Sequence, residues 1–222
     1  MRGGPKIIAC ALFLWLGLPL VGRAQVKEVK SFSRDMQVEM VKGRPVVSVT
    51  FDEVFTPRLR HRLSNGFTSR ILIDIVMSRD KKGTPLAQAL VQYTIIYDIW
   101  EERFNVREET PGGRKEYVVR SMKELIRNCG TLREVSLNPL LDLPAGTRSH
   151  IKVRITVNPT SRELRRKVRR YMANPGGHGR IGSPQGIFTF SWIFMNEKDI
   201  QADMVYTYKS QRFDLPAGEA AD

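Results

Sequence analysis

The fold class follows first from one stretch of the chain, FTSRILIDIVMS at residues 67–78. Its apolar side chains recur at every second position, at Ile71, Ile73, Ile75 and Met77. A period of two is typical of a β-strand that lays one face against a core. We therefore predict a long strand here, with one buried face.

The next apolar stretch, LAQALVQYTIIYDIW at residues 86–100, repeats this alternation over a greater length. One face carries Ala87, Ala89, Val91, Tyr93, Ile95, Tyr97 and Ile99. The other face is marked by Gln88, Gln92, Thr94 and Asp98. Antiparallel sheets commonly pack one face on the core and leave the other in water, so this pattern favours an antiparallel sheet.

Shorter strands flank these two long ones. They share the alternation and are expected at 36–41, 45–51, 102–109, 114–121, 132–138, 149–158 and 187–195. The sequences KGR and TPGG separate the first four into two hairpins. The last strand places four aromatic side chains on one face, which favours a central position in the sheet: Phe188, Phe190, Trp192 and Phe194.

Two short segments change to helical spacing and carry capping residues. Residues 55–66 offer Thr56 as the cap, Pro57 in the first turn and Gly66 at the end. Residues 121–130 begin with the capping box that Ser121 forms with Glu124, and they end at Gly130. Both segments are expected to be helices of about two turns.

These elements amount to about eight strands and three short helices, counting the basic helix described below. The helices do not alternate with the strands, so a βαβ architecture is not expected. We predict a mainly β fold, an antiparallel two-layer β-sandwich with the helices on its connections. It forms a single domain over residues 25–209, and residues 210–222 form a flexible tail.

The N-terminus has the pattern of a secretory signal peptide over residues 1–24. Arg2 and Lys6 precede an apolar run at 7–21, and Gly22 and Ala24 stand three and one positions before the expected cut. Cleavage would lower the formal net charge from +13 to +10, since this segment holds three basic and no acidic residues. The alternative is an anchor that is retained. Either way we expect an exported protein, periplasmic or envelope-associated.

Cleavage would remove Cys10 and leave Cys129 without a partner in the chain. The fold must then be stable without an internal disulfide. A single thiol in an oxidising compartment is either buried or paired with another chain. Its position after an apolar pair in ELIRNCG favours burial.

The most distinctive segment is SRELRRKVRRYMANPGGHGR at residues 161–180. Thr160 and Glu163 have capping-box spacing. An apolar stripe of helical period consists of Leu164, Val168, Tyr171 and Met172. The remaining surface is basic, and its candidate binding residues are Arg165, Arg166, Arg169 and Arg170.

Three interpretations of this basic helix are open. The helix can dock its stripe on the sheet and leave a solvated basic rim. Its arginines can also contact an anionic membrane or an acidic protein partner. Nucleic acid is the third, and we do not expect it in an exported protein whose arginines surround the stripe without base-stacking aromatics.

The glycine-rich loop at 176–186 contains His178, a further candidate binding residue, and Ser183. It lacks the Lys-Ser or Lys-Thr of a phosphate loop and leads into a strand. Ile181 stands where a Gly-x-Ser-x-Gly motif needs its first glycine. An exposed loop is one interpretation, and a hydrolase site is the other.

Other catalytic or metal-binding patterns do not emerge from the sequence. Three scattered histidines and one cysteine give no metal-ligand spacing, and no nucleophile has a base nearby. We therefore expect no metal, no cofactor and no catalytic residues. Asp74 and Asp98 interrupt apolar strands and are expected to point to the wet face, although two inward-facing carboxylates would indicate a site.

The order of these segments resembles an exported bacterial family known as domain of unknown function 4390. The resemblance rests on the signal peptide, FTPRLRHRLSNGFTSRILIDIVMSRD, VQYTIIYDIWEERFNV, SMKELIRNCG and the terminal FTFSWIF. It covers most of residues 30–196, although the Arg-rich helix and the glycine loop have no place in the family pattern. It implies an envelope-located β-rich domain and supplies no catalytic residues.

The sequence therefore favours a non-enzymatic accessory or binding domain of the envelope. Its basic surface would contact an acidic protein or anionic lipid, with no small-molecule cofactor. The alternatives are an envelope hydrolase with a site at 176–186 and a structural subunit that self-assembles through a sheet edge.

Overall fold

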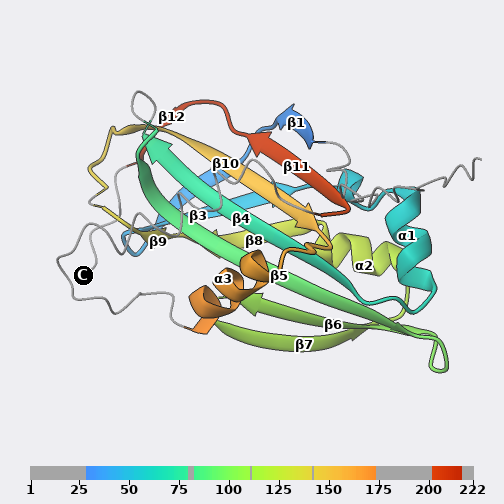
Figure 1. The fold of residues 1–222 in the computed structure, drawn as a ribbon. Coiled ribbons are helices and arrows are strands. Elements are labelled where there is room, and N and C mark those ends of the chain that lie inside the picture. Colours follow the sequence, from blue (N-terminus) through green and yellow to red (C-terminus); the bar gives the residue numbers. More distant parts are fainter. Residues whose placement is uncertain (1–28, 80–82, 111, 142, 174–201, 217–222) are drawn as a thin grey trace, which may run out of the picture.

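The computed structural model describes residues 29–79, 83–110, 112–141, 143–173 and 202–216 (Figure 1). Three of the segments discussed above lie outside these residues: the predicted signal peptide at 1–24, the glycine loop at 176–186 and the aromatic strand at 187–195. Among the helices within the described ranges, none is long and apolar enough to cross a bilayer.

Most of the fold is one nine-stranded sheet, whose main path is β1-β11-β10-β4-β5-β6-β7. In that order the strands are Val29–Ser33, Met204–Lys209, Arg148–Val157, Ser69–Arg79, Pro85–Asp98, Arg103–Thr110 and Gly113–Val119. Two short strands extend the path: β12, Phe213–Asp214, pairs with β10, and β9, Asn138–Pro139, pairs with β5. All pairs are antiparallel except β1 with β11.

A second, three-stranded antiparallel sheet has the order β2-β3-β8. Its strands are Gln37–Val41, Arg44–Thr50 and Thr131–Ser136. The predicted hairpins at 36–51 and 102–121 both form. The mainly β, sandwich-like fold with three α-helices in the described residues is confirmed.

Local sequence positions the first two helices, α1 at Pro57–Ser64 and α2 at Met122–Cys129. The Thr56 hydroxyl accepts the Leu59 N–H at 3.3 Å, and the Ser121 hydroxyl accepts the Glu124 N–H at 3.2 Å. Gly66 lies in the left-handed region at φ +74, as expected for a residue just past a helix. A short 3₁₀ turn, η1 at Asp52–Val54, precedes α1.

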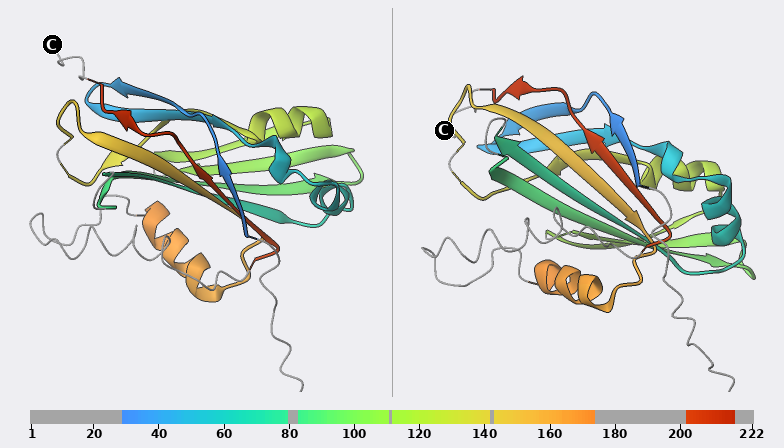
Figure 2. Two further views of the ribbon diagram at one scale, coloured as in Figure 1. Left: turned by 90° about the horizontal axis from the view of Figure 1, so that it is seen from above. Right: turned by 45° about the horizontal axis from the view of Figure 1, so that its top comes forward.

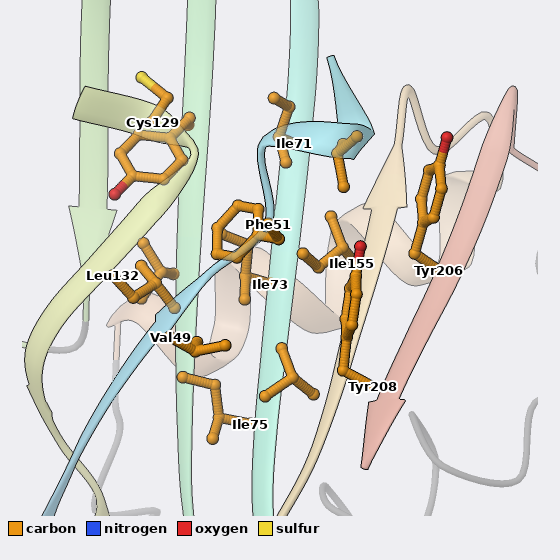
Figure 3. Close-up of a cluster of buried hydrophobic side chains, with 14 of the residues drawn as sticks. Val49, Phe51, Ile71, Ile73, Ile75, Cys129, Leu132, Ile155, Tyr206 and Tyr208 are labelled. Atoms are coloured by element: carbon orange, nitrogen blue, oxygen red, sulfur yellow. The ribbon is translucent and has the colours of Figure 1, made fainter. Parts of the chain in front are cut away.

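The inner face of the large sheet packs on the small sheet to form the main core (Figure 3). The predicted stripe of Ile71, Ile73, Ile75 and Met77 is fully buried. Val49, Phe51 and Leu132 contact it from the opposite layer. Cys129 is buried in the same core, so the thiol is inaccessible and burial raises its pKa to about 12.

The outer face of the large sheet is covered by α3, Arg162–Ala173 (Figure 2). The helix lies on the side of the sheet away from β2, β3 and α2. Its stripe residues Leu164, Val168 and Tyr171 pack on Leu72, Leu90 and Val205, and Met172 contacts this cluster at its margin. The helix cap differs from the prediction: the Ser161 hydroxyl accepts the Leu164 N–H at 3.2 Å, so Ser161, and not Thr160, starts the helix.

The C-terminal elements also differ from the prediction. Strand β11 was not expected, although Tyr206 and Tyr208 reach the inner core. The predicted tail at 210–222 is ordered at its start, because β12 pairs with β10 and Leu215 is buried. Short strands of two residues leave no periodic signal in a sequence, and this one depends on its neighbour for its structure.

Candidate functional site

Helix α3 presents its arginines away from the sheet. Successive residues turn about 100° around a helix axis, so the centre of Arg165, Arg166, Arg169 and Arg170 lies about 160° from the centre of the buried stripe. All four side chains are exposed. We call this set the arginine face. The packing of the stripe on the sheet holds the helix in place, and the arginine face is therefore directed toward solvent.

The arginine face has no acidic partner among the described residues. Glu163, the acidic residue of α3, pairs instead with Lys167, with 2.9 Å between Oε1 and Nζ. This ion pair lowers the pKa of Glu163. Arg165 stands four residues before Arg169, and Arg166 four before Arg170. Each such like-charged pair destabilises an isolated helix by about 0.2–0.5 kcal/mol. The helix therefore keeps a concentration of positive charge that an anion would neutralise.

Beneath α3, the outer face of the sheet buries a polar cluster. Asp74 on β4 lies in register with Arg154 on β10 and is only 4% exposed. Burial raises the pKa of Asp74 to about 7, although Arg154 and Lys152 act in the opposite direction. Burial also raises the pKa of the Tyr171 hydroxyl, which lies beside Asn138 and Gln88.

This cluster corrects the prediction of a wet outer face. Asp74 does point away from the inner core, but α3 covers it, and Gln88 is buried for the same reason. Asp98 does not join Asp74. It lies at the end of β5, where its carboxylate accepts the N–H groups of Trp100 and Glu101 at 3.0 and 3.1 Å.

The polar cluster can hold or release one proton near neutral pH, but it lacks a nucleophile with an oriented base. Asp74 Oδ2 has no hydrogen-bond donor in the described ranges. Across those same ranges, no three His, Cys, Asp or Glu side chains are grouped as metal ligands would be. Two candidates from the sequence, His178 and Ser183, lie outside the described residues.

The other histidines are not part of either group. His61 is exposed on α1, where its ring nitrogen Nδ1 lies 3.3 Å from Nδ2 of Asn65. His150 is half-buried on β10.

A pocket of about 240 Å³ opens at the end of the molecule that carries α1. Basic side chains of α1 and the aromatic ring that precedes β4 line one side. The residue after β10 and the residue before β11 line the other. The residues are Arg58, His61, Arg62, Phe67, Asn158 and Asp203. This pocket could not be predicted from the sequence, because its residues are distant from one another along the chain. The basic sequence PRLRHRLS, which contains no acidic residue, was the one local feature that could have indicated an anion-binding pocket here.

A wider, shallower hollow of about 540 Å³ lies on the part of the outer sheet face beyond α3. Ile96 and Val118 are its exposed apolar residues, and Arg70, Arg107 and Glu116 surround them. Arg107 and Glu116 pair across β6 and β7 at 2.8 Å. Since these charges already neutralise one another, the hollow is a weaker electrostatic site than the arginine face.

The comparisons with known proteins identify one family. The family model described as Domain of unknown function (DUF4390) matches residues 32–163. No curated protein and no solved structure matches the chain. The match ends at the first turn of α3, earlier than the expected limit near residue 196, so the arginine face lies beyond the matched region. Because the match spans more than half of the sequence, the chain belongs to the DUF4390 family.

Proposed function

We propose that the protein is a non-enzymatic binding domain of the bacterial envelope, and that the arginine face of α3 binds an acidic protein partner. The observation that carries the proposal is a row of four exposed arginines without acidic partners in the described residues, on a helix whose opposite side is fixed to the sheet. The sheet serves as the scaffold, and α3 is the contact element.

The side-chain chemistry favours carboxylates. All four residues are arginines, whose planar guanidinium groups bind carboxylates through two parallel hydrogen bonds. Lys167 is the one lysine of the helix, and it is already paired with Glu163. A row of arginines therefore suits a surface rich in aspartate and glutamate.

The packing of α3 disfavours insertion of this helix into a membrane. An amphipathic helix that lies in a bilayer buries its apolar face among the lipids. Leu164, Val168 and Tyr171 are instead buried against the sheet. Attraction to anionic headgroups would then rest on charge alone, at about 1 kcal/mol per basic residue near the surface.

Self-assembly through a sheet edge is less favoured. Strand β7 ends the main path of the large sheet, and its residues Arg114, Lys115 and Glu116 are exposed. Charged residues on an edge strand oppose pairing with a second sheet.

The test is capture of a partner from envelope extracts by crosslinking, followed by binding of the purified partner. Reversal of the arginine face in Arg165→Glu, Arg166→Glu, Arg169→Glu and Arg170→Glu removes four surface ion pairs. At about 0.2–1 kcal/mol each, their loss weakens binding by about 4- to 850-fold. The dissociation constant of the unmodified protein should also rise with salt.

A matched control reverses four exposed basic residues elsewhere: Lys42, Arg44, Lys123 and Arg133. This control has the same net charge and should keep the partner. Equal loss of binding in both variants would show that only net charge matters and would refute the arginine face as the site. Binding to anionic vesicles that is lost when the arginine face is reversed, without any protein partner, would also contradict the proposal.

A further inference from the structure

The three most exposed large apolar side chains of the described residues lie at one end of the molecule. They are Trp100 at 90%, Ile99 at 58% and Phe67 at 57%. Ile99 lies against Gly66, next to Phe67, since a Cβ at Gly66 would come within 3.5 Å of the Ile99 side chain. Single exposed apolar residues are common, but a cluster of this size indicates a contact surface.

The turn between β5 and β6 holds Trp100 in this exposed position. Asp98 accepts two N–H groups of the turn, and Glu102 adopts the left-handed conformation at φ +48. A turn with these constraints has a defined shape. The indole is therefore presented outward by the backbone and is not left exposed by a loose loop.

The pocket lined by Arg58, Arg62 and Phe67 adjoins these residues through Phe67. Helix α1, which lines it, lies at the same end of the ribbon as the turn between β5 and β6 (Figure 1). Phe67 belongs to both the pocket and the exposed cluster, because it lines the pocket and carries the Arg62 guanidinium over its ring at 5.4 Å. Arg58 also lines the pocket and has no acidic partner in the described ranges. A site for an anionic group thus adjoins an exposed aromatic and aliphatic surface.

We infer that this end docks on the interface of an anionic phospholipid bilayer. Trp100, Ile99 and Phe67 enter the boundary between headgroups and acyl chains, where tryptophan is favoured. Arg58 and Arg62 bind a headgroup phosphate at the pocket. The inference rests on a different surface from the arginine face and does not depend on the proposed function.

The charges of this end agree with an anionic surface. Helix α1 contributes Arg58, Arg60 and Arg62 without any acidic residue. The turn contributes three carboxylates, but that of Asp98 accepts backbone N–H groups and that of Glu101 pairs with Arg103. Glu102 and Asp203, whose carboxylate lines the pocket and accepts the Asn158 amide, oppose docking, and the three arginines outnumber them.

The test follows Trp100 in the full chain, with Trp15→Phe and Trp192→Phe so that it is the one fluorophore of its kind. Vesicles contain phosphatidylcholine alone or an equimolar mixture with phosphatidylglycerol, each with lipids brominated at known depths. We expect a blue shift and quenching by shallow bromines in the mixed vesicles. Because only Trp100 reports, attraction of residues 7–21 to the bilayer does not by itself produce the signal.

Two variants probe the two halves of the surface. Arg58→Glu with Arg62→Glu should lower the partition coefficient by about tenfold or more. Ile99→Ser should lower it by about tenfold while leaving the reporter and the charges intact. It also keeps the inference testable if the charge-reversal variant does not fold. Lys42→Glu in the turn between β2 and β3, combined with Arg44→Glu at the start of β3, serves as the control and should have no effect.

Absence of quenching in both kinds of vesicle would overturn the inference, as would quenching that neither variant reduces. Shielding of Trp100 from acrylamide that increases with protein concentration, without lipid, would assign this end to a second copy and would also overturn it. The variant with a reversed arginine face should keep the Trp100 signal, so failure of the proposed function and failure of this inference are distinguishable.

Discussion

The two faces of strand β4 are both buried, but by different means. On the inner face, Ile71, Ile73, Ile75 and Met77 meet a second sheet and form a continuous apolar core. On the outer face, Leu72 and its neighbour Leu90 on β5 meet one helix, and Asp74 lies on the same face in register with Arg154 of β10. The inner face is an obligatory core, whereas the outer face depends on a helix attached through a few side chains.

The comparison predicts that the largest loss of stability arises on the inner face. Ile73 is fully buried between the two sheets, where neighbouring strands prevent the structure from collapsing around a cavity. Ile73→Ala should lower the free energy of unfolding by about 4 kcal/mol. Urea unfolding followed by circular dichroism measures this. A loss below about 1 kcal/mol would mean that the inner face is not the main core.

The second prediction concerns pH and the outer face. The pKa of Asp74 is raised in the folded protein to about 7, so the folded state retains a proton that the unfolded state loses near pH 4. Its stabilising contribution is complete below the unfolded pKa and is lost as the pH rises through 7. From this group alone, the free energy of unfolding should fall by roughly 3 kcal/mol between pH 5 and pH 8.

Asp74→Asn removes this titration. Comparison of the variant with the unmodified protein at both pH values measures the titration of Asp74 together with its coupling to Lys152 and Tyr171, which share the outer face. The variant should show a smaller decline in stability with rising pH. Identical pH profiles would mean that water reaches Asp74 beneath α3.

The third and smallest effect is expected for the helix itself. Leu164 is buried between α3 and the sheet. After its truncation the helix can shift toward the sheet and fill part of the resulting cavity. Leu164→Ala should cost about 2 kcal/mol, less than Ile73→Ala. Amide hydrogen exchange should accelerate in α3 while β4 and β10 stay protected. A cost equal to that of Ile73→Ala would show that both faces belong to one cooperative core.

Much of the fold was predictable because its signals are local. The stripe on β4, the caps Thr56 and Ser121 and the hairpins at 36–51 and 102–121 all appear where the sequence indicates them. The strands that were missed, β1, β9, β11 and β12, lack a long alternation of their own. They are stabilised by pairing with neighbouring strands, β1 with β11, β9 with β5, and β11 and β12 with β10, which a single sequence does not report.

The candidate sites divide in the same way. The arginines of α3 were identifiable from helical spacing, because the stripe at Leu164 and Val168 fixes which residues share the opposite side. The pocket near Arg58 and the exposed surface around Trp100 were not identifiable. They join α1, the end of β5 and the end of β10, and only the tertiary structure brings these segments together.

By itself, the sequence determined which side chains share a face, since a period of two or of 3.6 residues follows from local backbone geometry. Only the tertiary structure decided what covers each face. The alternating sequence of β4 would be the same whether its outer face were exposed to water or covered by α3. Which of the two occurs depends on a helix far along the chain. That contact turned Asp74 from an expected surface carboxylate into a buried acid with a pKa near neutrality.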